Sequence, residues 1–313
     1  MSILEDNLQQ EQYLKTLFKI FYEKKYLFIS IIISSLLLGL TISYFFPNYY
    51  KSEAVLSSQT NKLNSSSNVP NIAGGFSSLG IDIGSIGSSG NEDVDRALAI
   101  SKSKSLLKNL IKKYDDILPS IMAPEKYIFS DDKLIFDNSK YDVDRKNWIR
   151  NVSPPKKKIP SFVEAHEEYL KIFKSRKNRL NGQVSMSVEH ISPSFAKSFL
   201  ERIILEMNLY GQKTDIEDAK NSIFFLEEKI SQNTSVALKN SLSRLMEKQL
   251  QIEMLASSSD EYLLNVIDYP FLPEQKTFPN RLIFIFIGLL FGLLFSLIYA
   301  MFMIANLNKS RED

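Results

Sequence analysis

Two long apolar runs lie near the ends of the chain, at residues 27–46 and 282–304, and neither contains a charged residue. A bilayer core of about 30 Å is crossed by about 20 apolar residues in a helix, so each run is long enough to span a membrane. A buried helix of a soluble protein normally keeps a polar stripe, and these runs have none. The pattern therefore predicts two transmembrane helices that flank a polar middle.

The first run is expected to be an uncleaved anchor. It is too long for the apolar region of a signal peptide, and no small-residue cleavage site follows it. Lys15, Lys19, Lys24 and Lys25 precede the first run, and Lys309 and Arg311 follow the second. By the positive-inside rule we expect a cytoplasmic tail at 1–26, an extracytoplasmic domain at 47–281 and a second cytoplasmic tail at 305–313.

In the middle of the chain, some segments alternate between apolar and polar residues as strands do, and others have the apolar spacing of helices. This combination predicts a mixed α+β domain. Strands are expected at 49–58, at 133–136 and at 182–190, where Val184, Met186 and Val188 fall on one face. A single helix is expected over 91–114, with Asn91 as its N-cap. Another is expected over 161–176, because Ser161 and Glu164 are spaced as a capping box. The rest of 115–160 reads as irregular.

The longest helical pattern begins at Ser192 and Pro193, a good N-cap followed by a good first-turn residue. The apolar stripe of this helix consists of Phe195, Phe199, Ile203, Met207, Tyr210, Ile223, Leu226 and Ile230. Gly211 is a candidate bend, and 233–235 reads as a break before a second helix. We expect a helical hairpin over about 193–257 that projects away from the membrane.

Two further segments are not helical. Residues 64–91 are rich in Gly and Ser, but they lack the Gly-Lys-Ser/Thr of a phosphate-binding loop and the dinucleotide fingerprint, so a flexible or loosely packed loop is favoured. Before the second apolar run stand Pro270, Pro273 and Pro279. Proline fixes φ and lacks an N–H, so this segment is expected to be an extended strap that joins the domain to the membrane.

Composition argues against catalysis and metal binding. The chain has no cysteine, which excludes disulfides, thiolate metal sites and cysteine nucleophiles. The only histidines, His166 and His190, fall on different predicted elements, and no nucleophile elbow is present. We expect no catalytic residue, no metal, no cofactor and no nucleic-acid partner. The basic run 154–160 could meet an anionic lipid or glycan, although a solvated turn is favoured.

Three motifs, in this order between two anchors, resemble the Wzz-type chain-length determinants, the polysaccharide co-polymerases of bacterial inner membranes. They are "YKSEAVL" after the first span, "NGQVSMSVEHISPSFAKSFLERII" leading into the long helix, and "VIDYPFLPEQKTFPNR" before the second span. The family usually has a Thr-Gly pair where this chain has Asn181 and Gly182. Some relatives continue into a tyrosine kinase domain, which we do not expect here.

The resemblance implies a non-enzymatic protein that stands in the periplasm as a homo-oligomeric ring of about eight copies. It implies as partners a membrane polysaccharide polymerase, a glycan or lipid-linked glycan, and membrane lipid. The alternative is a scaffold or export component of a polysaccharide secretion machinery. A two-span sensor, a periplasmic hydrolase and an efflux adaptor fit the layout less well.

Small residues recur every four positions in both spans, and they are the candidate interaction sites. The first ridge is Ser35, Gly39 and Ser43, and the second is Gly288, Gly292 and Ser296, continued by Ala300. Helices in lipid associate where small residues let their backbones approach. We expect the two ridges to pack against each other or against the polymerase, although such spacing also arises by chance.

Overall fold

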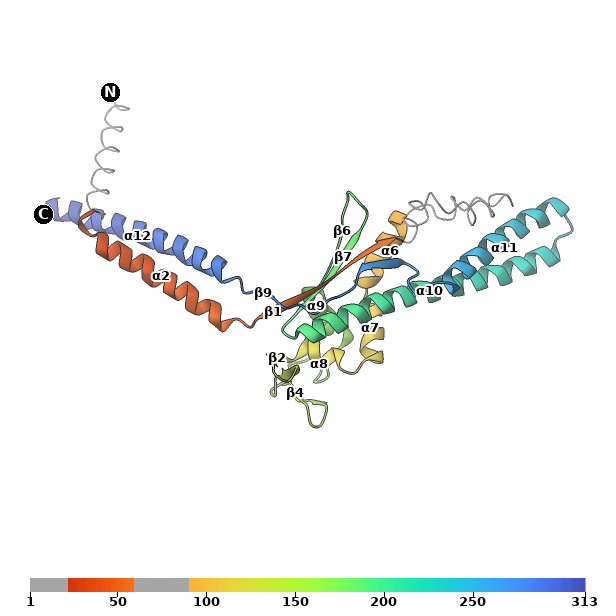
Figure 1. Cartoon of the computed structure of the whole chain (residues 1–313), viewed down its shortest axis with the longest axis horizontal. Coiled ribbons are helices and arrows are strands. Elements are labelled where there is room, and N and C mark those ends of the chain that lie inside the picture. The colour runs from red at the N-terminus through yellow and green to blue at the C-terminus, as the bar shows by residue number, and fades with distance from the viewer. Residues whose placement is uncertain (1–21, 59–89, 313) are drawn as a thin grey trace, which may run out of the picture. The chain divides into compact units, whose positions relative to one another are not determined.

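The computed structural model describes residues 22–58 and 90–312. It divides the chain into two compact units (Figure 1). The first, residues 1–48 with 277–313, is called the helix pair, and the second, residues 49–276, is called the mixed domain. Apolar helices near both ends and a mixture of helix and strand between them agree with the architecture that the sequence predicts.

The helix pair consists of α2 (Lys25–Phe45) and α12 (Arg281–Glu312). Both helices are long and apolar enough to cross a membrane, over Lys25–Phe45 and Arg281–Met303. Only 11% of the first stretch and 17% of the second are buried, so protein does not cover most of these apolar side chains. In water, this exposed apolar surface would be unfavourable, whereas lipid tails would cover it.

An antiparallel sheet forms the centre of the mixed domain. Its strands run in the order β6 (Phe173–Lys177), β7 (Val184–His190), β1 (Tyr49–Ser58) and β8 (Leu264–Asp268). The predicted strands at 49–58 and 182–190 are confirmed. In the register, Ala54 pairs with Met186 and Leu56 with Val184, and all four side chains are buried on one face, as period-two alternation requires.

Helices cover that face of the sheet and close the core. They are α6 (Gly90–Ser101), α7 (Lys104–Lys113), α8 (Ile117–Met122), α9 (Phe162–Ile172) and the first part of α10 (Pro193–Gln232). Tyr169 lies at the centre, stacked on Phe173 with ring centroids 5.1 Å apart and edge-on to Phe199. Its hydroxyl donates to the Ser101 carbonyl, which satisfies the one polar atom that the ring buries.

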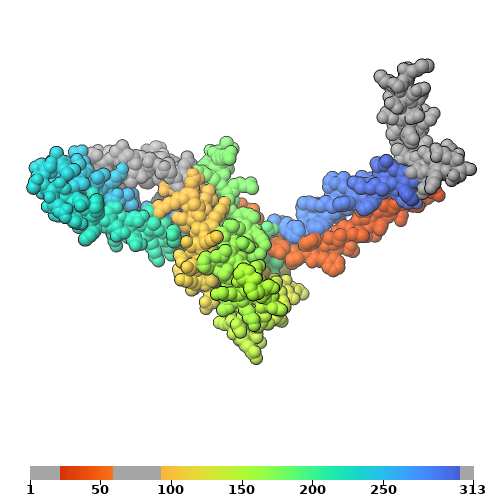
Figure 2. Space-filling model, turned by 180° about the vertical axis from the view of Figure 1, so that it is seen from behind, coloured from red at the N-terminus to blue at the C-terminus, as the bar shows by residue number. Residues whose placement is uncertain are grey.

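The second part of α10 and α11 (Val236–Ser257) form an antiparallel pair, which is called the arm (Figure 1). Figure 2 shows this pair extending beyond the rest of the mixed domain. The Ser192 hydroxyl accepts from the N–H of Phe195 and Pro193 opens α10, both as predicted. Residues 233–235 break the two helices, also as predicted.

Gly211 does not end or divide α10, which runs unbroken for 40 residues. A Cβ on Gly211 would lie 2.4 Å from Cδ1 of Leu263, so the glycine makes room for that buried side chain. Tyr210, predicted on the buried stripe, is exposed. The expectation for Tyr210 was wrong: the chain that leads into β8 packs at Gly211, and Tyr210 stays partly open to solvent. The bend at Gly211 stays a prediction.

Two predicted helices end earlier than the apolar pattern indicated. The helix expected over 91–114 is divided into α6 and α7, because the Ser103 side chain accepts from the N–H of Leu106 and caps a new helix. Asn91 lies inside α6 and is not its N-cap. The helix expected over 161–176 stops at Ile172, and Phe173–Lys177 pairs with β7 as a strand.

The region read as irregular contains short elements. The predicted strand at 133–136 is confirmed as β3 (Lys133–Phe136), and it forms a hairpin with β2 (Pro124–Ile128). The short strands β4 (Tyr141–Asp142) and β5 (Asn147–Trp148) form a second hairpin, and β9 (Lys276–Phe278) precedes α12. Of the Gly/Ser-rich loop predicted at 64–91, residues 64–89 lie outside the described residues, and Gly90 and Asn91 belong to α6.

Candidate functional site

The small residues of α2 and α12 meet in one seam within the helix pair. The Ser35 hydroxyl donates a hydrogen bond of 2.7 Å to the Gly288 carbonyl. A Cβ on Gly288 would lie 2.9 Å from the Ser35 carbonyl oxygen, and one on Gly39 would lie 2.8 Å from that of Phe284. A Cβ on Gly292 would lie 3.1 Å from a backbone carbon of α2. Only glycine permits this approach of two backbones.

The remaining candidates in the two helices continue the seam. Ser43 on α2 and Ser296 and Ala300 on α12 are buried almost completely. Phe28 packs edge-on against Tyr299, with ring centroids 6.2 Å apart. The structure thus brings the two ridges together, which is one of the two arrangements expected from the sequence. Whether the seam serves length control stays a prediction.

Aromatic side chains gather where α2 ends and α12 begins. Phe46 lies 5.7 Å from Phe278 and 5.6 Å from Phe284, measured between ring centroids. The guanidinium of Arg281 lies 4.4 Å from the ring centroid of Tyr44. Aromatic rings with an adjacent cation are typical of the level at which a span leaves the lipid.

The three strap prolines lie between β8 and α12, in a segment without helix. Pro270, Pro273 and Pro279 are all buried. The Ser52 hydroxyl of β1 donates a hydrogen bond of 2.8 Å to the Phe271 carbonyl, which holds the first part of this segment along the sheet.

Asn208 on α10 fixes the start of β8 and was not predicted from the sequence. Its Oδ1 accepts from the N–H groups of Leu263 and Leu264, at 2.8 and 3.0 Å. Its Nδ2 donates to the carbonyls of Ile204 and Leu264. The side-chain amide is buried, and both its oxygen and its nitrogen have hydrogen-bond partners. Asn208 therefore acts as a polar clamp between α10 and the sheet.

The arm carries apolar side chains that nothing in the described chain covers. These exposed residues are Phe224, Phe225, Val236, Leu238, Leu245, Leu250, Met254 and Leu255. Phe225 and Leu226 of α10 and Leu245 of α11 line a groove between the two helices. Gln212 and the Lys220–Glu253 ion pair join the helices elsewhere. A pair of helices of this length would normally bury such residues against a further helix.

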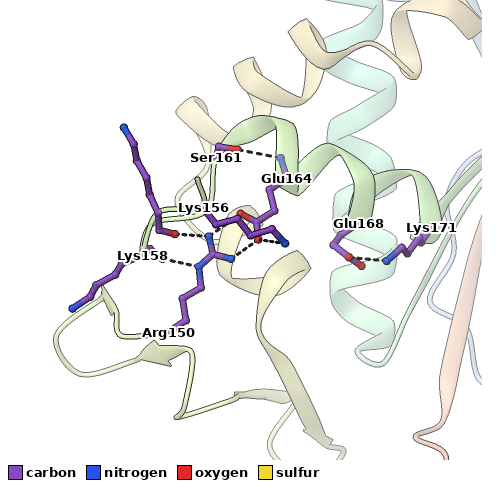
Figure 3. A network of polar contacts seen from close by, with 8 residues as sticks. Arg150, Lys156, Lys158, Ser161, Glu164, Glu168 and Lys171 are labelled. Carbon is purple, nitrogen blue, oxygen red and sulfur yellow. Dashed lines mark hydrogen bonds and ion pairs between the residues drawn. The ribbon is translucent and has the colours of Figure 1, made fainter. Parts of the chain in front are cut away.

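Arg150 organises the basic run at 154–160 (Figure 3). Its Nε donates to the Lys158 carbonyl and its Nη2 to the Lys157 carbonyl, both at 2.7 Å. The same guanidinium binds the Glu164 carboxylate through two bonds. The hydrogen bond from Arg150 holds the pKa of Glu164 below its ordinary value. An open cavity of about 640 Å³ lies beside this pair.

The capping box at Ser161 is half formed. The Ser161 hydroxyl accepts from the N–H of Glu164 at 3.2 Å, as predicted. The Glu164 side chain is instead held by Arg150, which is the better partner because it is charged and bidentate.

Both histidines make bonds to the backbone. His190 donates through Nε2 to the Ser120 carbonyl at 2.9 Å, and its Nδ1 accepts from the N–H of Ser192. Burial lowers the pKa of His190 to about 4. His166 lies 2.7 Å from the Lys102 carbonyl. Within residues 22–58 and 90–312, no three His, Asp or Glu side chains form a group that could hold a metal.

No family model and no curated protein sequence matches the chain. Among solved structures it is similar to a full-length bacterial polysaccharide co-polymerase, with a TM-score of 0.38 and 11% identity over 92% of this chain and 96% of that one. It is also similar to a point mutant of a Shigella flexneri lipopolysaccharide O-antigen chain-length regulator, with a TM-score of 0.25 and 10% identity over 73% and 99% of the two chains. Both solved structures belong to the group that the three sequence motifs resemble.

Proposed function

We propose that this chain is a non-enzymatic regulator of the bacterial inner membrane. It sets the length of a surface polysaccharide that a separate membrane polymerase makes, either an O-antigen-like glycan or a capsular polysaccharide or exopolysaccharide. The observation that carries the proposal is the combination of a packed pair of apolar helices with an arm of uncovered apolar residues on one chain. The order of the three sequence motifs between the two spans supports the same class.

The arm favours assembly with further copies of the chain. Exposed aromatic and aliphatic side chains on a helical pair cost free energy in water, and a neighbouring arm could cover them. A head-to-tail contact that closes into a ring leaves no copy with an uncovered face. About eight copies are expected from the family resemblance, a number that the geometry of one chain does not give.

The proposed topology places both tails in the cytoplasm and the mixed domain in the periplasm. The lysines before α2 support this orientation, because basic residues next to a span stay on the cytoplasmic side. A reporter that is active only in the periplasm should be active when fused after Ser258 and silent after Asp313. Activity after Asp313 would overturn the two-span arrangement.

Deletion in a host that makes the polysaccharide tests the function. A length regulator should leave polymer in place but change its distribution, which is visible as a lost modal band on a gel of the glycan. The runner-up, a scaffold or export component of the secretion machinery, should instead reduce the surface polymer at unchanged length. Complete loss of polymer would point to an enzyme of the assembly and contradict both readings.

A further inference from the structure

Exposed apolar side chains from two distant parts of the sequence border the start of β1. The first is Phe129, which directly follows β2 and is 60% exposed. Its ring packs edge-on against Tyr50, with centroids 5.3 Å apart, and against Tyr127 at 4.8 Å. Two ring contacts hold Phe129 at the surface, where its outer edge stays open to the surroundings.

The second group belongs to the segment after β8. Phe271 is 57% exposed and Leu272 is 54% exposed. The hydrogen bond from Ser52 to the Phe271 carbonyl places this segment beside β1. Tyr50 and Ser52 are two residues apart on one strand, so their side chains share a face. Both apolar groups therefore adjoin the same end of β1, and no described residue covers them.

The chain itself limits how far this end of β1 can be from the membrane. Phe46 belongs to the aromatic cluster at the end of the helix pair, and Tyr50 follows four residues later. An extended chain spans at most about 3.6 Å per residue, so the Cα atoms of Phe46 and Tyr50 are no more than about 14 Å apart. Phe129 touches Tyr50, so the membrane surface at Phe46 is within reach.

We propose that Phe129, Phe271 and Leu272 insert into the headgroup region of the membrane that the helix pair crosses. The mixed domain would then rest on the lipid surface through this edge. The proposal depends on the proposed function only in requiring that α2 and α12 span the membrane. The hairpin carries Glu125, Asp131 and Asp132 against Lys126 and Lys133, so it brings no excess of positive charge to the lipid surface, and the contact depends on apolar insertion.

The absence of cysteine in the chain allows a direct test. Phe129→Cys, Phe271→Cys and Leu272→Cys, each labelled with an environment-sensitive fluorophore, would be studied in the full chain in vesicles of bacterial phospholipid. Nitroxide quenchers would be attached either to the headgroups or deep in the acyl chains. Ile33→Cys, exposed on α2, reports on the span, and Leu180→Cys reports on a position far from it.

Leu180 is a matched control because it is 98% exposed and lies in the turn before β7. Val184, at the start of β7, pairs with Leu56, which is six residues beyond Tyr50 along β1. We expect blue-shifted emission and strong headgroup quenching at 129, 271 and 272, with neither change at 180. The label at 33 should be quenched by the acyl-chain nitroxide.

The outcomes separate this inference from the proposed function. If position 33 is quenched while 129, 271 and 272 behave as position 180 does, the helices span but the edge does not touch lipid, and the inference is wrong. If position 33 is not quenched, the membrane anchoring fails, and the proposed function fails with it. Quenching at only one of the three edge positions would also contradict the proposal, since both groups adjoin one end of β1.

Discussion

The Ser35 hydroxyl donates a 2.7 Å hydrogen bond to the backbone carbonyl of Gly288 on the facing helix. A serine side chain is short, so it reaches a neighbouring backbone only where two helices are in close contact. Gly288 and Gly39 create that contact by leaving no Cβ between the backbones. The hydrogen bond and the glycines are therefore one arrangement, and each depends on the other.

Replacing Gly288 and Gly292 by leucine should force the two helices apart. A Cβ alone at position 288 would stand 2.9 Å from the Ser35 carbonyl oxygen, and overpacking of this kind typically costs about 1–3 kcal/mol per site. We expect Gly288→Leu with Gly292→Leu to insert normally but to widen or erase the modal glycan length. The measurement is a gel of the glycan at matched protein expression.

Leu290→Ala with Leu294→Ala is the matched control, because both side chains are exposed on another face of α12. This variant should keep the wild-type length distribution. If the glycine variant also keeps it, α12 is only an anchor, and length control belongs to the mixed domain and the arm.

Arg150 should stabilise the mixed domain more than any exposed arginine. Arg150→Lys keeps the charge but loses the planar fork that binds Glu164 and two carbonyls of the basic run. We expect a loss of about 2–4 kcal/mol in the free energy of unfolding, measured by denaturant titration in detergent. Arg145→Lys, whose side chain is 85% exposed, should change stability by less than about 0.5 kcal/mol.

Stability should fall in acid because of His190. Its pKa is about 4 in the folded chain and 6.5 ordinarily, so between these values the unfolded chain binds a proton that the folded chain does not. Stability is therefore highest above pH 6.5 and is lost as the pH falls towards 4, by on the order of 3 kcal/mol. The measurement is the unfolding free energy at a series of pH values.

His190→Asn separates this titration from the other acid-sensitive groups. Its amide oxygen can still accept from Ser192, but the side chain takes up no proton in this range. The variant should be less stable at pH 7, because it loses the bond to Ser120 and the ring contact with Phe195. Its stability should also depend less on pH between 6.5 and 4, and an unchanged dependence would assign the acid effect to other residues.

The sequence predicted the elements whose signals are local. The alternation at 182–190 and the cap at Ser192 depend on neighbouring residues, and both are present in the structure. The ends of two helices were missed, because a serine cap at Ser103 and pairing of 173–177 with β7 outweigh a continuing apolar period.

The features that depend on distant contacts could not be derived in the same way. Asn208 reads as an ordinary polar residue on a helix, and only the passage of Leu263 and Leu264 beside it makes it a clamp. In the sequence, Gly211 suggests only a candidate bend. That it makes room for the Leu263 side chain is visible only in the structure. In the spans the spacing of small residues was visible, but the choice of partner needed the structure.

The exposed apolar surface of the arm gives the sharpest test of assembly. Phe225 and Leu245 line one groove and are both about half exposed, so in a lone chain a charge at either position should be tolerated. If a neighbouring copy covers the groove, Phe225→Glu with Leu245→Glu buries two charges at an interface and should break it. We expect a shift from a large species to small ones in mass measurements in mild detergent, with the mixed domain still folded.

Asn240→Glu adds charge at an exposed polar position of α11 and should leave the assembly intact. A double variant that assembles as the wild type does would show that the arm is not the contact between copies, and the ring would then need another surface.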